Sequence, residues 1–399
     1  MPAAMSELSE NVRTLQPSAT IAVASKAREL KAQGRDIVDL SAGEPDFPTP
    51  RFIAEAGRAA IEAGRTRYTP AAGILELRQA VARDLAERHG QAVDPAGVVV
   101  SAGAKQALFN SLFALVGPGD KVLVPVPYWT SYPEMVSLAR AQPVAVRGPE
   151  ARGYRVGPEE LEAAWSPDVR VLLLNSPSNP SGAVYRAAEL EAILAWAADR
   201  GVWVVSDEIY GRLCYLDGPA PSIHDFPPNL RERTVLIDGA SKVFAMTGWR
   251  IGWSVSDPRL ASTLSALQSH TTSNAATPSQ YAALAALTAT AEQDAVLERM
   301  AAEFRDRRDL VLRLLEQHFP GTGRVAPEGA FYLFFRVDGW FDQERPDSVA
   351  LCTWLIEHAG VALVPGSAFG DDRYVRLSFA ASTDALSDGF ARLARTLGA

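Results

Sequence analysis

The sequence is poor in cysteine and histidine and has no long apolar run. Its 399 residues include 2 cysteines and 5 histidines, which form no cluster typical of metal ligands. Cys214 and Cys352 lie far apart, so we expect two buried thiols rather than a disulfide. No stretch reaches the roughly 20 apolar residues that span a bilayer. The first residues lack the basic and apolar regions of a signal peptide, so we expect a cytoplasmic protein. Because the cysteines and histidines form no cluster, we also expect no metal site.

Positive charge is also scarce. Lysine and arginine number 39 against 47 acidic residues, which gives a formal net charge of −8. This balance argues against nucleic acid or an anionic membrane as a partner. The phosphate-loop, zinc-protease and serine-hydrolase signatures are absent. Residues 321–326 match a loose dinucleotide-binding pattern, but they follow no strand and precede no helix, so we reject this match.

The chain instead shows apolar strands that alternate with helices. This alternation predicts an α/β fold with a mainly parallel sheet covered by helices on both faces. A helix is expected to start at Thr49-Pro50, with Thr49 as its N-cap. Residues 278–319 have helical apolar spacing and predict a long connector to a second domain. The strands expected in the large sheet are 98–101, 121–126, 171–174, 202–205 and 234–238.

Polar residues follow several of these strands directly. Asp207 comes just after one buried strand, and Lys242 follows another after a turn of small residues. Ligands of parallel sheets bind at the carboxyl ends of strands. A lysine there can be a desolvated amine fit for Schiff-base chemistry, and the nearby Arg250 can clamp a phosphate. Taken alone, each residue has a plainer interpretation, as a solvated lysine or a turn-capping aspartate. With Tyr210 and Asn179, they match an aldehyde cofactor that carries a pyridine nitrogen, a phenolate oxygen and a phosphate.

Six motifs spread over nearly the whole chain carry a family resemblance. The sequence resembles fold type I aminotransferases of class I/II, which use pyridoxal 5′-phosphate (PLP), and most of all the bacterial aspartate aminotransferase subgroup with its aspartate/prephenate enzymes. The resemblance implies a large PLP-binding domain over 48–285 and a smaller, discontinuous α/β domain from 1–47 and 286–399. The motifs are Ala-Gly-Glu-Pro-Asp-Phe (42–47), Tyr-Thr-Pro-Ala-Ala-Gly (68–73), Pro-Tyr-Trp (127–129), Asn-Ser-Pro-Ser-Asn-Pro-Ser-Gly (175–182), Ser-Asp-Glu-Ile-Tyr (206–210) and Ser-Lys-Val-Phe-Ala-Met-Thr-Gly-Trp-Arg-Ile-Gly (241–252).

The resemblance also implies a role for each cofactor residue. Lys242 would form the Schiff base with PLP and move the proton during the reaction, as general base and then acid. Asp207 would keep the pyridine nitrogen protonated. The residues expected to hold the rest of PLP are Tyr210 and Asn179 at the ring oxygen, Trp129 on the ring face, and Gly103, Ala104, Lys105 and Arg250 at the phosphate.

The substrate side follows from the same resemblance. Arg376 would clamp the α-carboxylate together with Asn179 and the backbone of Gly43, with Trp129 alongside, and Lys105 would help bind a distal carboxylate. Tyr68 would reach the phosphate of a neighbouring subunit, which implies a homodimer with shared active sites. The plainer alternatives are a surface arginine, a core tryptophan and an ordinary loop tyrosine.

Two positions depart from the family pattern. Gly239, three residues before Lys242, stands where animal-type relatives carry a phosphate-binding serine. Ser241 lies directly before Lys242 instead, and we set it aside as a phosphate ligand. Gln16 is neutral where this subgroup often has a basic residue that binds acidic substrates. The neutral Gln16 weakens the prediction of a dicarboxylate substrate, and it weakens that of prephenate more.

The predicted activity is amino-group exchange between an L-amino acid, with aspartate favoured, and a 2-oxo acid such as 2-oxoglutarate. Aromatic, alanine and kynurenine-type aminotransferases are the alternatives, followed by a carbon–sulfur lyase of similar architecture. A non-enzymatic sensor of PLP or amino acids is disfavoured, because Lys242 is present and the first 36 residues are too short and not basic enough for a DNA-binding domain.

Overall fold

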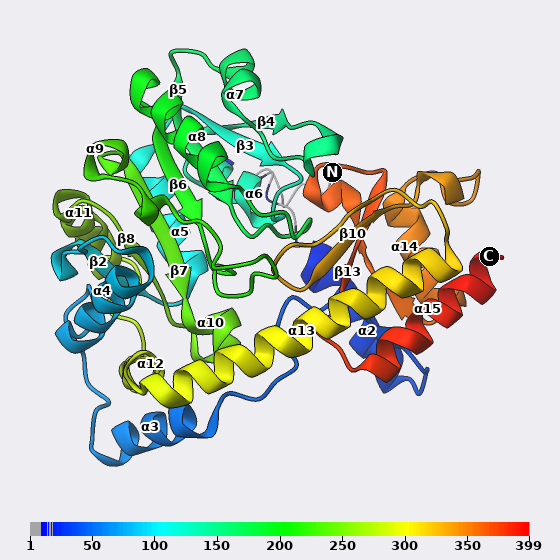
Figure 1. Ribbon diagram of the computed structural model, residues 1–399, viewed down its shortest axis with the longest axis horizontal. Helices are drawn as coiled ribbons and strands as arrows, with labels where there is room; N and C mark the ends of the chain where they lie inside the picture. Colours follow the sequence, from blue (N-terminus) through cyan, green and yellow to red (C-terminus); the bar gives the residue numbers. More distant parts are fainter. Residues whose placement is uncertain (1–8, 14, 16, 18, 399) are drawn as a thin grey trace.

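The computed structural model describes residues 9–13, 15, 17 and 19–398. A seven-stranded sheet with the order β2-β8-β7-β6-β5-β3-β4 forms its centre (Figure 1). Only β8 runs antiparallel to its neighbours, so the predicted mainly parallel α/β sheet is confirmed. Its strands are β2 (Val98–Ser101), β3 (Lys121–Val126), β4 (Gln142–Arg147), β5 (Val169–Asn175), β6 (Trp203–Asp207), β7 (Thr234–Gly239) and β8 (Gly252–Val255).

Helices cover both faces of this sheet because its strands are apolar on both sides. In β5, Val171 and Leu173 pack in one core cluster, whereas Leu172 and Leu174 pack in another. Successive side chains of a strand point to opposite faces, so a continuous apolar run needs a cover on each. The helices of this part are α3 (Arg51–Glu62), α4 (Leu75–His89), α5 (Ala104–Leu115), α6 (Ser131–Leu138), α7 (Pro158–Ala164), α8 (Ala187–Arg200), α9 (Pro228–Arg231), α10 (Ala240–Val243), α11 (Pro258–Ser269) and α12 (Thr277–Thr288).

Two smaller sheets lie beside the large one. One is antiparallel with the order β12-β13-β10-β9, and the other pairs β1 with β11 in parallel. Their strands are β1 (Val38–Asp39), β9 (Arg324–Val325), β10 (Tyr332–Arg336), β11 (Val361–Ala362), β12 (Val364–Pro365) and β13 (Tyr374–Ser378). The remaining helices are α1 (Glu10–Arg13), α2 (Ala19–Ala32), α13 (Thr290–His318), α14 (Ser348–His358) and α15 (Thr383–Leu397).

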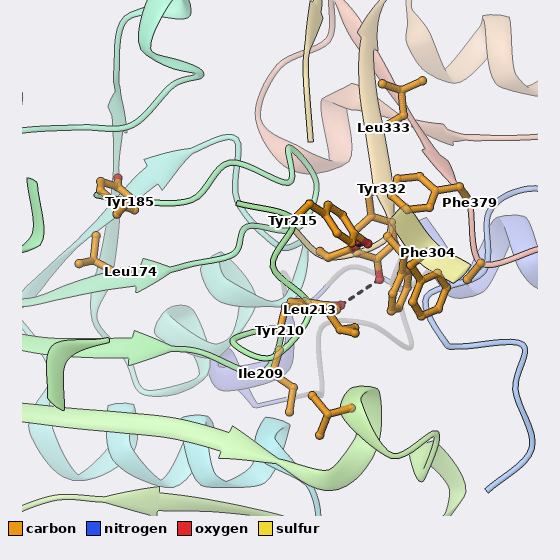
Figure 2. Close-up of a cluster of buried hydrophobic side chains, with 14 of the residues drawn as sticks. Leu174, Tyr185, Ile209, Tyr210, Leu213, Tyr215, Phe304, Tyr332, Leu333 and Phe379 are labelled. Carbon is orange, nitrogen blue, oxygen red and sulfur yellow. Dashed lines mark hydrogen bonds between the residues drawn. The ribbon is translucent and has the colours of Figure 1, made fainter. Parts of the chain in front are cut away.

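The long helix α13 runs from the region of α12 to the smaller sheets, as the yellow ribbon of Figure 1 shows. The sequence predicted one helical connector over 278–319, but two helices occupy this span. Ala289 separates them with φ −88° and ψ 72°, a conformation outside the α-helical region. Phe304 of α13 stacks on Phe331 at 5.3 Å between ring centroids, next to Tyr210 from the large-sheet side (Figure 2). One continuous aromatic core therefore joins the sheets.

The predicted N-cap at Thr49 is wrong. Helix α3 has Pro50 at its N-cap and no side chain that caps it. The Thr49 hydroxyl donates instead to the carbonyl of Ala245 at 2.7 Å and accepts from the Trp249 indole at 3.0 Å. The Thr49 hydroxyl therefore holds the segment after Lys242, because these two tertiary hydrogen bonds take the place of a capping bond to helix α3.

Two expectations about composition are tested directly. Cys352 is a buried free thiol, whereas Cys214 is also free but only half-buried, so the expectation of two buried thiols is half right. Among the described residues, no helix is long and apolar enough to cross a membrane.

Candidate active site

A cavity of about 520 Å³ opens where the large sheet meets the smaller ones. It collects residues that follow β5, β6 and β7 as well as residues from β10, β13 and α2. Every site residue predicted from the sequence lines it, except Tyr68 and Gly103. The predicted residues on its wall are Gly43, Ala104, Lys105, Trp129, Asn179, Asp207, Tyr210, Lys242, Arg250 and Arg376.

Lys242 lies in the single-turn helix α10, directly after the buried strand β7. Its Nζ donates to the carbonyl of Gly43, which brings the glycine of the Ala-Gly-Glu-Pro-Asp-Phe motif beside the amine. Burial lowers the pKa of the Lys242 amine to about 8, against a partial opposite effect of Glu44. About a tenth of this amine is therefore neutral at pH 7, more than for an ordinary lysine, and can act as a nucleophile or a base.

Asp207 ends β6 and is buried. One carboxylate oxygen accepts the hydroxyl of Tyr132 at 2.8 Å, and the other accepts the backbone N–H of Ile209 at 3.2 Å. Burial raises the pKa of Asp207 to about 6, while the hydrogen bond from Tyr132 opposes that rise. The group is thus a carboxylate at neutral pH, and it also caps the following turn, as the plainer interpretation of the sequence proposed.

The N-terminus of α5 and the guanidinium of Arg250 lie together at one corner of the cavity. Gly103 precedes the helix with φ 90°, and a side-chain carbon at this position would lie 2.6 Å from Nη2 of Arg250. The guanidinium therefore packs directly on the glycine backbone, and Nη1 donates to the carbonyl of Thr247 at 2.8 Å. Free N–H groups of a helix N-terminus beside an arginine attract a phosphate.

At the opposite side of the cavity, Arg376 projects from the middle strand pair of the four-stranded sheet. It is 1% exposed, and its nitrogens donate to Oδ1 of Asn179 at 3.0 Å and to the carbonyl of Ser41 at 2.8 Å. Its Nε has no hydrogen-bond partner, and no carboxylate pairs with it among the described residues. A buried guanidinium without a counter-ion is costly, so this geometry favours an anionic ligand.

Trp129 and Lys105 form the wall between these two ends. Nζ of Lys105 lies 4.6 Å from the centroid of the Trp129 ring and donates to the hydroxyl of Ser131 at 3.2 Å. Burial, with a smaller effect of Arg250, lowers the pKa of the Lys105 amine. The lysine thus faces the cavity and is not simply a solvated residue at a helix start.

Other predicted positions lie elsewhere. Tyr68 is 88% exposed and outside the cavity, so within one chain the structure does not bring it to the other site residues. Ser241, set aside as a phosphate ligand, does line the wall, and Gln16 lies outside the described residues.

Sequence reasoning missed three residues that touch the predicted ones. Tyr132 supports Asp207, and Tyr332 has its hydroxyl 2.9 Å from that of Tyr210. Asn175 donates to the Asp207 carbonyl at 2.9 Å and accepts the N–H of Asn179 at 2.8 Å. Asn175 belongs to a recognised motif and Tyr132 follows one, whereas Tyr332 belongs to none of the six. Only the packing of separate elements indicates the partner of each.

Comparison with known proteins places this arrangement in a family. The model for class I and II aminotransferases matches residues 35–392. An aspartate aminotransferase of Streptomyces avermitilis is 42% identical over 403 residues, covering 98% of this chain and 96% of that protein. An aspartate/prephenate aminotransferase of Thermus thermophilus is 42% identical, covering 99% of this chain and 100% of that protein.

A solved structure of aspartate aminotransferase from Thermus thermophilus with maleate superposes with a TM-score of 0.93 at 42% identity. The superposition covers 98% of this chain and 99% of that one. Fold and sequence similarity agree along nearly the whole length of the chain. The protein therefore belongs to the class I and II aminotransferase family.

Proposed function

We propose that the protein is a PLP-dependent aminotransferase that exchanges an amino group between aspartate and 2-oxoglutarate. One observation carries the proposal most strongly: the buried Arg376, without a carboxylate partner among the described residues, faces the same cavity as Lys242 and Asp207. An amine, a carboxylate and an unpaired guanidinium are the groups that an amino-acid substrate and an aldehyde cofactor require. The names of the relatives support aspartate as the donor.

The residues of the cavity fit PLP. Arg250 and the start of α5 would hold its phosphate, where Gly103 leaves room for the guanidinium against the backbone. Asp207 would pair with the ring nitrogen, and Tyr210 and Asn179 would contact the ring oxygen. When bound, PLP supplies an aldehyde carbon and a ring that accepts the electrons of the substrate α-carbon.

Lys242 performs the proton transfer in this proposal. Its lowered pKa leaves part of the amine neutral, so it can take the proton from the substrate α-carbon and would deliver it to the former aldehyde carbon of PLP. The Gly43 carbonyl, which accepts a hydrogen bond from Nζ, keeps the amine at this side of the cavity. Asp207, ionised at neutral pH, keeps the ring nitrogen protonated.

Two cationic residues would select a dicarboxylate. Arg376 has donors left for the α-carboxylate after its bonds to Asn179 and Ser41. Lys105 faces the same cavity and carries no ion pair with a described carboxylate, so it would bind the distal carboxylate. Gln16, the neutral position of the N-terminal segment, is proposed to contribute no charge.

A half-reaction assay tests the activity and the substrate together. The PLP-loaded protein is mixed with one amino acid at a time, and the cofactor absorbance is followed. We expect aspartate to convert the cofactor rapidly to its amine form, with phenylalanine and alanine much slower. Conversion by phenylalanine or alanine but not by aspartate would contradict the proposed substrate and favour the aromatic or alanine alternative.

The carboxylate clamp has a separate test. Arg376→Ala removes the charge that holds every α-amino acid, so kcat/KM is expected to fall roughly 100-fold or more for all substrates alike. Steady-state kinetics with aspartate and glutamate measure this loss. An unchanged kcat/KM would remove Arg376 from the site.

Higher-order features complete the proposal. We propose a homodimer in which Tyr68 of one subunit reaches the phosphate site of the other; its 88% exposure in the single chain supports this role. The proposed domains are 48–285, and 1–47 with 286–399. A cytoplasmic location is also part of the proposal.

A further inference from the structure

Tyr332 touches two of the predicted site residues, Tyr210 and Arg376, although no sequence motif assigned it a role. It begins β10 and is completely buried, yet it also lines the cavity. Figure 2 shows it between Tyr210 on one side and the aromatic core on the other. Its position lets one side chain contact two residues that have separate proposed tasks.

The hydroxyl of Tyr332 meets the hydroxyl of Tyr210. The two oxygens are 2.9 Å apart, drawn as the dashed line in Figure 2. A phenol has one proton to donate and can accept other bonds. Burial raises the pKa of both tyrosines, so both carry their proton at neutral pH. If Tyr210 gives its proton to the cofactor oxygen, Tyr332 must be the donor of this pair.

The ring of Tyr332 meets Arg376. The guanidinium carbon lies 4.4 Å from the ring centroid, a distance typical of a cation–π contact. The ring of Phe369 lies near the same guanidinium at 5.1 Å. The face of the guanidinium thus rests on aromatic rings, while its edge donates to Asn179 and Ser41.

We propose that Tyr332 is a positioning residue that sets both proposed contacts at once. Its hydroxyl donates to Tyr210 and so directs the Tyr210 proton toward the ring oxygen of PLP. Its ring holds the guanidinium of Arg376 in the plane that receives the α-carboxylate. The inference rests on the proposed function, because it needs both the cofactor and the carboxylate sites.

The two contacts can be separated with two substitutions. Tyr332→Phe removes the hydroxyl and keeps the ring, whereas Tyr332→Leu removes both. Tyr185→Phe is the matched control, since Tyr185 is a buried tyrosine outside the cavity whose hydroxyl accepts the N–H of Val156 at 3.0 Å. Far-UV circular dichroism and a melting curve of each protein establish that it is folded at the assay temperature.

Two measurements on the PLP-loaded proteins report the contacts without turnover. The first is the pH midpoint of the visible cofactor absorbance, and the second is the dissociation constant of maleate, an unreactive dicarboxylate. A hydrogen bond donated to the ring oxygen makes the nearby cofactor-bound nitrogen of Lys242 less basic. We therefore expect Tyr332→Phe to move the midpoint to higher pH by about 0.5–1 unit and to leave maleate binding within about twofold, because the ring remains.

Tyr332→Leu is expected to move the midpoint equally and also to weaken maleate binding roughly tenfold. The control should match the wild type in both measurements. An unchanged midpoint in Tyr332→Phe would overturn the role of the hydroxyl. Maleate binding that is lost already in Tyr332→Phe, or kept in Tyr332→Leu, would overturn the role of the ring. A wild-type protein that shows no bound-PLP absorbance would instead refute the proposed function, and the inference with it.

Discussion

At the scale of single residues, buried ionisable groups behind the cavity decide which charges face it. Asp207 keeps its charge because Tyr132 and a backbone N–H donate to its two oxygens. Glu208, the next residue, points to the other side and accepts from the Ser206 hydroxyl at 2.9 Å and the Ile223 N–H at 3.1 Å. Each carboxylate has its own donors, so each can be altered separately.

Tyr132→Phe is expected to raise the pKa of Asp207 further, since one carboxylate oxygen loses its donor while burial remains. The rise should be about one to two pKa units, because a hydrogen bond to a charged group contributes roughly 1.5–3 kcal/mol. Asp207 would then be partly protonated near neutral pH, and PLP affinity would fall. Infrared titration of the Asp207 carboxyl in the PLP-free protein measures the shift, with Tyr185→Phe as control. An unmoved titration would show that Tyr132 does not support the charge.

Glu208→Gln tests the second carboxylate through stability. Burial raises the pKa of Glu208 from 4.5 to about 7 in the folded protein. The folded state therefore holds this proton more tightly than the unfolded chain, and the resulting stabilisation is lost as the pH rises through about 7. Glutamine does not titrate. The free energy of unfolding of the variant, relative to that of the wild type, should therefore rise by roughly 2 kcal/mol between about pH 5 and pH 8. Urea denaturation of both proteins measures this, and a difference that stays constant with pH would contradict it.

At the scale of elements, the ends of strands and helices build the site. Strands β5, β6 and β7 each deliver their polar residue at the same edge of the sheet, because parallel strands share a direction. Helix α5 begins near this edge, and its first turn meets Arg250 through Gly103. The guanidinium of Arg250 lies so close to the backbone of Gly103 that no side chain would fit there. The φ of 90° at Gly103 also favours glycine.

Gly103→Ala is expected to push the Arg250 guanidinium away from α5 and to raise the dissociation constant of PLP roughly tenfold. The backbone strain of a side chain at positive φ adds a loss of stability of about 1–2 kcal/mol. Gly119→Ala is the matched control, since Gly119 has φ 93° but nothing within 4 Å of the added carbon. Both variants should melt at lower temperature, and only Gly103→Ala should bind PLP more weakly. Equal PLP affinity in the two variants would argue against the proposed phosphate site at Arg250 and the start of α5.

At the scale of the whole molecule, the three sheets meet around the cavity. The large sheet supplies the amine and the carboxylate, whereas the four-stranded sheet supplies the carboxylate clamp. The aromatic core around Phe304 and Phe331 ties them together. Within one chain, Tyr68 remains apart from this assembly, so its proposed role requires a second subunit.

A complementation experiment tests the shared site. Lys242→Ala and Tyr68→Ala are each expected to be strongly impaired, because each removes a group from every site of its homodimer. When the two are unfolded and refolded together, half of the dimers should be mixed, and each mixed dimer should contain one intact site. Activity should recover to about a quarter of the wild-type value. No recovery above the sum of the separate variants would contradict sharing.

Much of the fold and the site could be predicted from the sequence. Five apolar strands and their mainly parallel direction follow from local patterns that persist in the structure. Strands β4 and β8 and the order of the strands in the sheet were not predicted. Lys242, Asp207 and Asn179 were identified because they follow such strands. Local interactions failed as a guide where tertiary contacts compete, as at Thr49, whose hydroxyl bonds Ala245 rather than its own helix.

The sequence by itself determined which residue types follow each strand, because burial and turn chemistry act over a few neighbouring positions. Only the tertiary structure decided which of them touch. Tyr132 and Asp207 are 75 positions apart, Tyr210 and Tyr332 122 apart, and Asn179 and Arg376 197 apart. Contacts over such separations arise when whole elements pack against one another, and no local pattern encodes the side-chain directions that result.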